Sequence, residues 1–410
     1  MARILFISRY YWPEKCVAAV CVHETTRRLA EMGHQVTVLT TVPNYPTGIV
    51  PQAYRGHVLQ KETVDNVFIV RAWSYTSENK GFLKRIVSQL SFGCLAPFLG
   101  GRAVGKPDLI VVESPPLFNV IAAHVLAWWK RCPFLFWVAD LWPESAIQLG
   151  VLHNPLLIAL SQWLEQVTYR RARTTWAVTE GMRATLIRNG LAPERILLIT
   201  NGVDTVKFQP RSQEQARREL GWDQRFTVLY AGTHGLSHGL TSVLDAATRL
   251  QHREDIRFVF AGAGAEKADL VALARRRNLK NVVFLDAFPH EQMPLVLAAA
   301  DVCLAHTRKL PIFEGMLPIK MYEAMACGRP LIVGLNGEAR QIAEREARAA
   351  LYVEPENAEA LADAVCYLFD HPEVAQQLGQ QGRRYVCEHF DYDTLTTRVN
   401  AHLKTLLYAS

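Results

Sequence analysis

The fold is decided by one stretch of the sequence, residues 318–333, which reads PIKMYEAMACGRPLIV. Pro318 suits the first turn of a helix, where the amide that proline lacks would have no partner. Gly328 suits the left-handed position that closes a helix, and Arg329-Pro330 prevents the helix from continuing. The apolar run Leu331–Val333 is typical of a buried strand. The stretch therefore predicts a helix followed directly by a strand.

The same alternation of strand and helix extends over the rest of the chain. Short apolar or β-branched runs, typical of buried strands, are separated by segments of helical length. The expected strands are Ile4–Ser8, Val36–Thr40, Phe68–Ala72, Leu109–Val112, Phe134–Val138, Thr175–Val178, Thr227–Tyr230, Arg257–Ala261, Val282–Leu285, Val302–Ala305 and Leu331–Val333. Because parallel strands need crossover connections, this pattern predicts an α/β protein with two doubly wound, Rossmann-like parallel-sheet domains.

The boundary between the two domains is marked by a turn signal and a polar segment. Asn201–Asp204 predicts a turn, and a polar helix starts after Phe208, so we place the linker near residues 200–225. We expect a first domain over 1–200 and a second over 201–387, with a last helix at about 388–410 packing back on the first. Since doubly wound folds bind ligands beyond the carboxyl ends of their strands, we expect a central cleft between the sheets, lined by the loops after strands.

The composition predicts a folded globular protein in a reducing compartment. Of the 410 residues, 50% are hydrophobic and 20% are charged, which excludes a disordered or collagenous chain. The eight cysteines form no CxxC pair, so neither a disulfide framework nor a zinc site is predicted. The N-terminus is typical of a first strand rather than a signal peptide, and we expect no transmembrane helix.

Two residues of the decisive helix suggest an anionic ligand. The positive end of the helix dipole opposes a lysine in the first turn, so Lys320 would be stabilised by an anion such as a diphosphate. Glu323, one turn further on, could accept hydrogen bonds from a ribose diol. The spacing alone is also compatible with a plain surface lysine and with a carboxylate that only favours the helix dipole.

These residues belong to a longer pattern that resembles a known family. The string from Gly315 to Pro330, Gly-x-x-Pro-x-Lys-x-x-Glu-Ala-Met-Ala-x-Gly-x-Pro, resembles the retaining glycosyltransferases of family 4, which have the two-domain GT-B fold. Asp140–Glu144 (DLWPE), Thr179–Met182 (TEGM) and Asn201–Asp204 (NGVD) resemble the branch that builds bacterial O-antigen, capsule and exopolysaccharide units, as N-acetylfucosaminyl transferases do. The resemblance implies sugar transfer from a nucleoside diphosphate sugar, in which a diphosphate oxygen takes the acceptor proton on the face that the leaving group occupied.

The resemblance also implies a donor site in the second domain. Glu323 matches the glutamate that binds the donor ribose. The family's first glutamate should stand at the position of Gly315, and Glu314 lies one residue before it. Gly264, in a turn after a strand, and His290, in the stretch that contacts the base, are further candidates for donor binding.

The family's usual cations at the diphosphate are missing from this sequence. An arginine and a lysine grip the diphosphate in many members, but Thr233 follows Gly232 here and His238 precedes Gly239. Their role would then fall to Lys320 and to the backbone amides of Gly315, Met316 and Leu317. We therefore expect Lys320 to act on the leaving diphosphate as well as to bind it.

In the first domain the resemblance directs attention to the loop after Phe134–Val138. Asp140 and Glu144 follow that strand and would hold sugar hydroxyls or orient the acceptor, although Asp140 could equally cap a helix. The family's histidine before this aspartate is absent, because Ala139 stands there. Asp391-Tyr392-Asp393 spells a metal-binding Asp-x-Asp but precedes an expected helix, where aspartates cap. We expect no metal and no cofactor besides the nucleotide-sugar donor.

Charge and one amphipathic segment suggest a membrane surface as a partner. Residues 1–204 carry 21 basic and 14 acidic side chains, whereas residues 205–410 carry 24 and 25. Within the basic half, Gly81–Leu99 mixes bulky apolar residues with Lys80, Lys84, Arg85 and Arg102, as an interfacial helix does, although such helices also pack on cores. Because the family's acceptors are often undecaprenyl-diphosphate sugars, we expect a lipid-linked saccharide acceptor and a cytoplasmic location, peripheral on the inner membrane. No recognition motif predicts nucleic acid as a partner.

The sequence therefore predicts a hexosyl- or N-acetylhexosaminyl-transferase with a UDP-sugar as its donor. Two alternatives stay open at this point. A UDP-sugar 2-epimerase has the same fold and would act on UDP-N-acetylglucosamine without an acceptor. A non-catalytic nucleotide-sugar-binding protein would explain the absent histidine, arginine, lysine and first glutamate.

Overall fold

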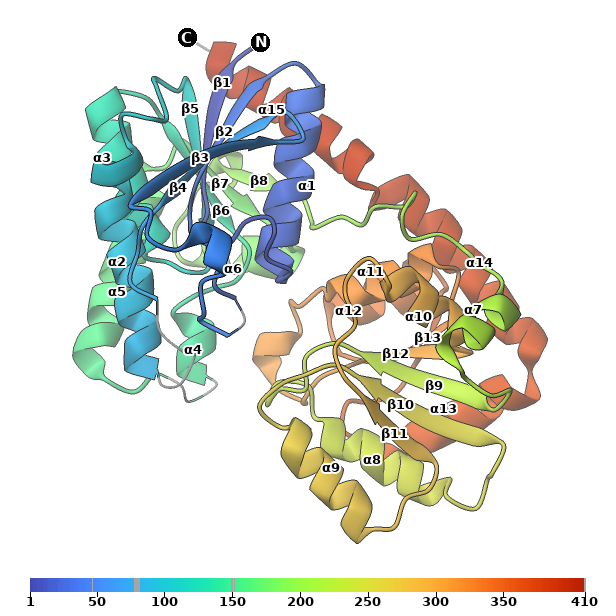
Figure 1. Cartoon of the computed structure of the whole chain (residues 1–410). Coiled ribbons are helices and arrows are strands. Elements are labelled where there is room, and N and C mark those ends of the chain that lie inside the picture. The colour runs from blue at the N-terminus through green and yellow to red at the C-terminus, as the bar shows by residue number, and fades with distance from the viewer. Residues whose placement is uncertain (46, 77–81, 149, 151, 409–410) are drawn as a thin grey trace. The chain divides into compact units, whose positions relative to one another are not determined.

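The computed structural model describes residues 1–45, 47–76, 82–148, 150 and 152–408. The chain divides into two compact units, one formed by Met1–Asn201 together with the chain from Leu395 onward and the other by Gly202–Thr394. In each unit a largely parallel sheet lies between layers of helices (Figure 1). The predicted pair of doubly wound α/β domains is confirmed.

The first unit is built on an eight-stranded sheet in the order β3-β4-β2-β1-β5-β6-β7-β8. Its strands are β1 (Arg3–Ile7), β2 (Gln35–Thr41), β3 (Leu59–Val64), β4 (Val67–Ala72), β5 (Leu109–Ser114), β6 (Phe134–Val138), β7 (Thr174–Ala177) and β8 (Ile196–Leu198). The expectation of a parallel sheet is wrong at one edge, because β3 pairs antiparallel with β4. Asp65 and Asn66 both have positive φ (48° and 62°) and form a two-residue hairpin turn, which needs no crossover helix.

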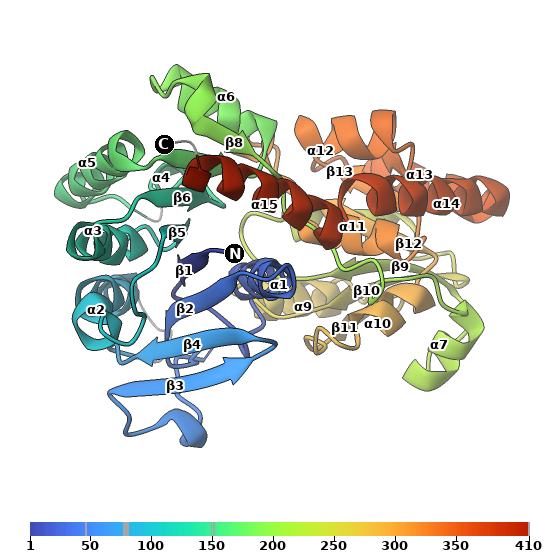
Figure 2. The ribbon, with the colours of Figure 1, turned by 90° about the horizontal axis from the view of Figure 1, so that it is seen from above.

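Helices cover both faces of this sheet. They are α1 (Val17–Glu31), α2 (Phe82–Gly100), α3 (Asn119–Lys130), α4 (Glu144–Gln148), α5 (Pro155–Arg171), α6 (Glu180–Arg188) and α15 (Tyr392–Tyr408). Figure 2 shows α2, α3 and α5 in a row along one face and α1 and α15 along the other. The last helix is fixed to this unit by polar contacts, since His34 Nε2 lies 2.9 Å from Asn400 Oδ1 and Arg398 donates to the Leu198 carbonyl.

The second unit has a six-stranded parallel sheet in the order β11-β10-β9-β12-β13-β14. Its strands are β9 (Phe226–Ala231), β10 (Ile256–Ala261), β11 (Val282–Leu285), β12 (Val302–His306), β13 (Leu331–Gly334) and β14 (Ala350–Tyr352). Alternate residues of β9 enter two different cores: Val228 and Tyr230 join one, Leu229 and Ala231 the other. Both faces of this sheet are therefore buried, as the near-continuous apolar strands predict.

Helices of the second unit form one layer on each face of its sheet. They are α7 (Gln213–Leu220), α8 (Leu240–Arg249), α9 (Lys267–Arg276), α10 (Met293–Ala299), α11 (Ile319–Ala326), α12 (Glu338–Arg340), α13 (Ala358–Asp370) and α14 (Pro372–His389). The core beside α8, α9 and α13 takes one face, and the core beside α10, α11 and α14 takes the other (Figure 1).

The predicted helix of the decisive stretch is α11. It starts at Ile319, one residue later than expected, because Pro318 has extended backbone angles and only precedes the first turn. Gly328 has φ +67° and closes the helix as predicted. Lys320 therefore lies in the first turn of α11, where the backbone amides have no partner inside the helix.

Candidate functional site

Lys320 lies at the carboxyl end of the second sheet, against the end of β9. Its half-buried Nζ is 2.8 Å from Tyr230 Oη and 4.1 Å from the centre of the Tyr230 ring. The Tyr230 hydroxyl donates to the Thr233 carbonyl at 2.8 Å, so its oxygen accepts from the lysine. Tyr230 thus holds the ammonium group over the loop that follows β9.

The loops after β9 and β10 approach each other so closely that only glycine fits at Gly262 and Gly264, and Gly232 borders the Lys320 side chain. A Cβ on Gly232 would lie 2.8 Å from Lys320 Nζ, and one on Gly262 would lie 1.9 Å from the Gly232 carbonyl oxygen. Gly264, a predicted donor-site residue, lies against the backbone of His234, whose carbonyl oxygen would be 2.2 Å from an added Cβ. Because Gly232 has no side chain, a ligand can approach the Lys320 ammonium group closely on that side. Gly264 allows the two loops to pack against each other.

The charge at this site is concentrated on Lys320. Desolvation lowers the pKa of Lys320 to about 7, and no carboxylate of the described residues forms an ion pair with it. Burial lowers the pKa of His234 to about 4 and that of His238 to about 3, so both rings are neutral at pH 7. His238 therefore does not replace the family's missing cation, whereas a bound anion would restore the full charge of Lys320.

Thr233 and His238, the two residues predicted in place of the family's cations, use their carbonyl groups within the loop. The Thr233 carbonyl accepts from the Tyr230 hydroxyl, and Thr233 is exposed. The His238 carbonyl lies 2.8 Å from His306 Nδ1, and the His306 Nε2 in turn accepts from the Glu356 amide at 3.2 Å. His306 thereby orients the loop that carries His238.

Glu323 and His290, predicted separately, are brought together in the structure. His290 Nε2 lies 3.0 Å from Glu323 Oε1, and His290 Nδ1 lies 2.7 Å from Lys207 Nζ. A lysine only donates, so Nδ1 accepts from Lys207 and Nε2–H donates to Glu323. His290 thus holds one oxygen of a half-buried carboxylate and leaves the other oxygen for a further donor.

The remaining residues predicted to bind the donor sugar nucleotide lie in the segment before α11. Glu314 is exposed, and its carbonyl accepts from the Glu338 amide at 2.8 Å. The Met316 amide donates to the Phe313 carbonyl at 3.0 Å, so it is already used in a turn. Within the described chain, the amides of Gly315 and Leu317 donate to no backbone acceptor. These two amides, rather than that of Met316, have the capacity to meet an anion in front of α11.

In the first unit, Asp140 and Glu144 follow β6 as predicted, but the structure does not bring their side chains into contact. Asp140 is exposed, and its carboxylate accepts from the Ser145 hydroxyl at 3.1 Å. Glu144 is the first residue of α4 and accepts from Gln148 at 2.5 Å. Both carboxylates thus border the carboxyl edge of the sheet while stabilising the short helix α4.

The loop after β1 is shaped by the buried carboxylate of Glu14. Glu14 accepts from the amides of Asn44 and Tyr45, each at 2.8 Å, and from that of Tyr11 at 3.3 Å. The carboxylate thereby joins the loops that follow β1 and β2.

Exposed aromatic side chains stand on three neighbouring loops at this edge. Trp12 follows β1, Tyr45 follows β2, and Trp73 follows β4. Since these strands are adjacent in the sheet, the three rings belong to one side of its carboxyl edge.

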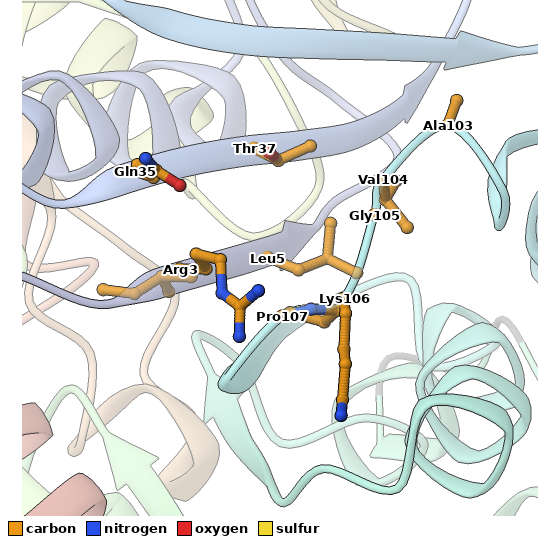
Figure 3. A pocket seen from close by; sticks show the side chains of 10 residues that line it. Arg3, Leu5, Gln35, Thr37, Ala103, Val104, Gly105, Lys106 and Pro107 are labelled. Atoms are coloured by element: carbon orange, nitrogen blue, oxygen red, sulfur yellow. The ribbon is translucent and has the colours of Figure 1, made fainter.

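A hollow of about 270 Å³ lies at the opposite edge of the same sheet (Figure 3). It is lined by the first residues of β1 and β2, Arg3 and Gln35, and by the segment 103–107. Arg3 is paired with Asp108 there. Because ligands of doubly wound folds bind at the carboxyl ends of strands, this hollow is not the predicted site.

The Asp-x-Asp motif has a structural use. Asp391 accepts from the Thr205 hydroxyl and from the Asp393 amide, and so fixes the start of α15. The described residues contain no group of three or more histidines, cysteines or carboxylates placed to hold a metal ion.

Among the described helices, none is long and apolar enough to cross a membrane.

Sequence reasoning missed three residues of the candidate donor site: Lys207, Tyr230 and His234. Tyr230 was expected only as a strand residue, and Lys207 lies in the linker, far in sequence from His290. His234 is fully buried, and neither ring nitrogen has a hydrogen-bond partner among the described residues. Its position in the Gly232–Gly239 loop is the one signal that could have drawn attention to it.

Comparisons with known proteins agree with this fold. Residues 18–202 match the model of the glycosyl transferase 4-like domain, and residues 212–385 match that of glycosyl transferases group 1. WcaI of Escherichia coli strain K12, whose name assigns it provisionally to colanic acid biosynthesis as a glycosyl transferase, is 26% identical over 392 residues, or 92% of this chain and 96% of WcaI.

Two solved structures share the whole architecture. Sucrose-phosphate synthase from Thermosynechococcus elongatus has a TM-score of 0.79 at 20% identity and covers 99% of both chains. Anabaena HepE, in complex with UDP and glucose, has a TM-score of 0.74 at 15% identity and covers 99% of this chain and 100% of HepE.

The fold and the family matches define the class of this protein: it is a glycosyltransferase with the GT-B fold. More particularly, the chain belongs to the glycosyltransferases that join a glycosyl transferase 4-like domain to a group 1 domain.

Proposed function

We propose that the chain transfers a hexosyl or N-acetylhexosaminyl group from a UDP-sugar to a lipid-linked or saccharide acceptor in the synthesis of bacterial surface polysaccharide, with retention of configuration. One observation carries the proposal: Lys320 presents an ammonium group without an ion-pair partner among the described residues, next to Gly232 and in the first turn of α11, which the amides of Gly315 and Leu317 precede. Such an arrangement fits a diphosphate. The name of WcaI and the UDP bound by HepE support the pathway and the base.

In this function Lys320 stabilises the diphosphate as it leaves the sugar. Negative charge develops on the leaving oxygen during transfer, so a fixed cation and the amides in front of α11 stabilise the transition state more than the ground state. We assign no nucleophile; instead, the leaving diphosphate oxygen takes the acceptor proton on the same face of the sugar. Lys320 and the amides supply the positive charge, and we propose no metal or cofactor.

The ribose of the donor would be held by Glu323. His290 and Lys207 fix one carboxylate oxygen, so the other is oriented before the ligand arrives. A diol could then donate to it without a loss of side-chain freedom on binding.

The acceptor would bind to the first unit. Exposed aromatic rings bury the apolar faces of sugars well, and Trp12, Tyr45 and Trp73 provide three rings at one edge of the sheet. Asp140 and Glu144 at the end of β6 would accept from sugar hydroxyls. A lipid-linked acceptor would place the protein at the cytoplasmic surface of the inner membrane.

A thermal-shift panel tests the donor. UDP, GDP, dTDP and CMP are compared at the same millimolar concentration, and a nucleotide present at about 100 times its dissociation constant should add about 2.7 kcal/mol to the free energy of unfolding. We expect UDP to give the largest shift. Incubation with UDP-N-acetylglucosamine alone is the second arm, because its conversion to the 2-epimer would contradict the transferase and identify an epimerase. Absence of a shift with every nucleotide would also contradict the proposal.

The Glu323→Ala variant tests the ribose contact. We expect it to weaken UDP binding about 10- to 150-fold, because a charge-assisted hydrogen bond contributes about 1.5 to 3 kcal/mol. Binding of 2′,3′-dideoxy-UDP should change little, since that analogue lacks the diol. Titration calorimetry of both ligands measures the difference, with Glu359→Ala at an exposed position of α13 as the matched control. Equal losses for both nucleotides would rule out the ribose assignment.

A further inference from the structure

Three neighbouring helices of the first unit carry apolar side chains on their solvent side. Helices α2 and α3 pack along each other, and His124 of α3 lies 3.1 Å from the Thr168 hydroxyl of α5. Figure 2 shows the three side by side over one face of the sheet. Their outward surface is called the α2–α3–α5 face below.

Helix α5 carries apolar side chains on its solvent side as well as on its core side, where Leu164 and Tyr169 pack. Leu156, Leu160 and Trp163, at spacings of four and three residues, form one stripe and are 80%, 55% and 61% exposed. The opposite side of the helix buries polar Ser161 and Thr168, which are 3% and 0% exposed. A helix that only packs on a core buries its apolar stripe, so this stripe requires another explanation.

Helices α2 and α3 extend the apolar surface. Phe98 of α2 is 70% exposed and Trp128 of α3 is 82% exposed. Val87 and Leu90 are also exposed on α2, so its apolar residues recur along one side of the helix. Lys80 and Gly81, at the start of the predicted interfacial segment, lie outside the described residues. The predicted segment is thus only one part of a larger apolar surface.

The charges around this face are almost entirely positive. Helices α2, α3 and α5 contain a single carboxylate, Glu165, which accepts from the Tyr169 hydroxyl at 2.7 Å. Cations stand near the ends of the three helices: Lys84, Arg85, Lys130, Arg131, Arg170 and Arg171. An anionic partner would match this border of charges.

We propose that the α2–α3–α5 face docks the enzyme on an anionic lipid bilayer, with Trp128 and Trp163 inserted at the level of the headgroups. Exposed tryptophans and leucines bordered by lysine and arginine are the residues that bind a membrane interface. A second copy of the chain is a poorer occupant, because a two-fold contact would bring the cations of both copies together. The proposal rests on the proposed function, in which the acceptor is attached to a membrane lipid.

Vesicle co-sedimentation of the full chain tests the apolar part of this face. We compare vesicles of phosphatidylethanolamine and phosphatidylglycerol with vesicles of phosphatidylcholine, and expect stronger binding to the anionic ones, weakened by salt. Trp128→Ser combined with Trp163→Ser should reduce partitioning at least about tenfold, since two exposed aromatic anchors are lost. The matched control is Val58→Ser with Val206→Ser, which changes two other exposed apolar residues. Partitioning of the tryptophan variant equal to that of the control would overturn the proposal.

A charge variant and two further measurements separate this proposal from its competitors. Lys84→Glu with Arg85→Glu should reduce binding to anionic vesicles at low salt by about 25-fold or more, since each of the two cations near such a surface adds about fivefold. All face variants should bind UDP as the unchanged protein does, so failure of the proposed function would appear as lost UDP binding instead. If sedimentation velocity showed that the face holds a dimer together and vesicle binding were absent, the membrane assignment would be wrong.

Discussion

Replacing Lys320 with alanine is expected to weaken UDP binding by about 10- to 150-fold. The estimate follows from the loss of one charge-assisted contact, which contributes about 1.5 to 3 kcal/mol. The turnover rate should fall further, because the same charge stabilises the leaving diphosphate in the transition state. Titration calorimetry with UDP and single-turnover kinetics with the donor measure the two effects.

The matched control for this prediction is Lys280→Ala. Lys280 is exposed and precedes β11. Its substitution therefore removes the same charge at the opposite edge of the same sheet. UDP binding by the Lys280 variant should equal that of the unchanged protein. If both variants lose the same affinity, a general effect of charge explains the loss and the diphosphate contact is wrong.

The pH dependence of UDP binding should have a definite sign. The pKa of Lys320 is about 7 in the free protein, and a bound diphosphate would raise it. Binding therefore takes up a proton above pH 7, and affinity should fall by up to about tenfold per pH unit as the pH rises from 7 to 9. The Lys320→Ala variant should lose this part of the pH dependence.

Replacing Glu113 with glutamine is expected to stabilise the first unit at pH 8 and above by several kcal/mol. Glu113 ends β5, is 2% exposed and pairs with the Ser8 hydroxyl at 3.0 Å. Burial raises the pKa of this carboxyl to about 8, above the ordinary value of 4.5. Glutamine is neutral at every pH and nearly equal in shape, so it avoids the cost of ionising a buried group.

The sign of this effect follows from proton binding. Between pH 4.5 and pH 8 the folded protein keeps the proton on Glu113 and the unfolded chain releases it, so the free energy of unfolding falls as the pH rises. The slope is about 1.4 kcal/mol per pH unit at most, and it should be absent from the glutamine variant. Urea unfolding from pH 5 to pH 9 measures both slopes, with exposed Glu194→Gln as the control. Equal slopes in the variant and the unchanged protein would contradict the assignment.

Most of the fold could be predicted because buried parallel strands are nearly continuous apolar runs. Phe134–Val138 and Val282–Leu285 were predicted at their exact ends as β6 and β11. Strand β3 was missed because its sequence, LQKETV, is polar and its residues are only partly buried. The Asp65-Asn66 pair was the available signal, since such pairs favour a two-residue hairpin.

The candidate site could be predicted only where the chemistry is local in sequence. Lys320 stands between a proline and a glycine that bracket one helix, so its position in the first turn follows from neighbours alone. The contact with Tyr230 joins residues 90 positions apart, and the contact between Lys207 and His290 joins residues 83 apart. Contacts of that kind depend on how segments distant in the sequence pack against each other, which a single sequence does not specify.

The carboxylate of Glu14 stiffens the carboxyl edge of the first sheet, where we propose that the acceptor binds. Glu14 accepts hydrogen bonds from the amides of Tyr11, Asn44 and Tyr45, and these bonds hold the loop after β1 and the loop after β2 in a fixed relative position. A saccharide resting on Trp12 and Tyr45 would meet a surface already in its bound shape, and little conformational entropy would be lost in forming the complex.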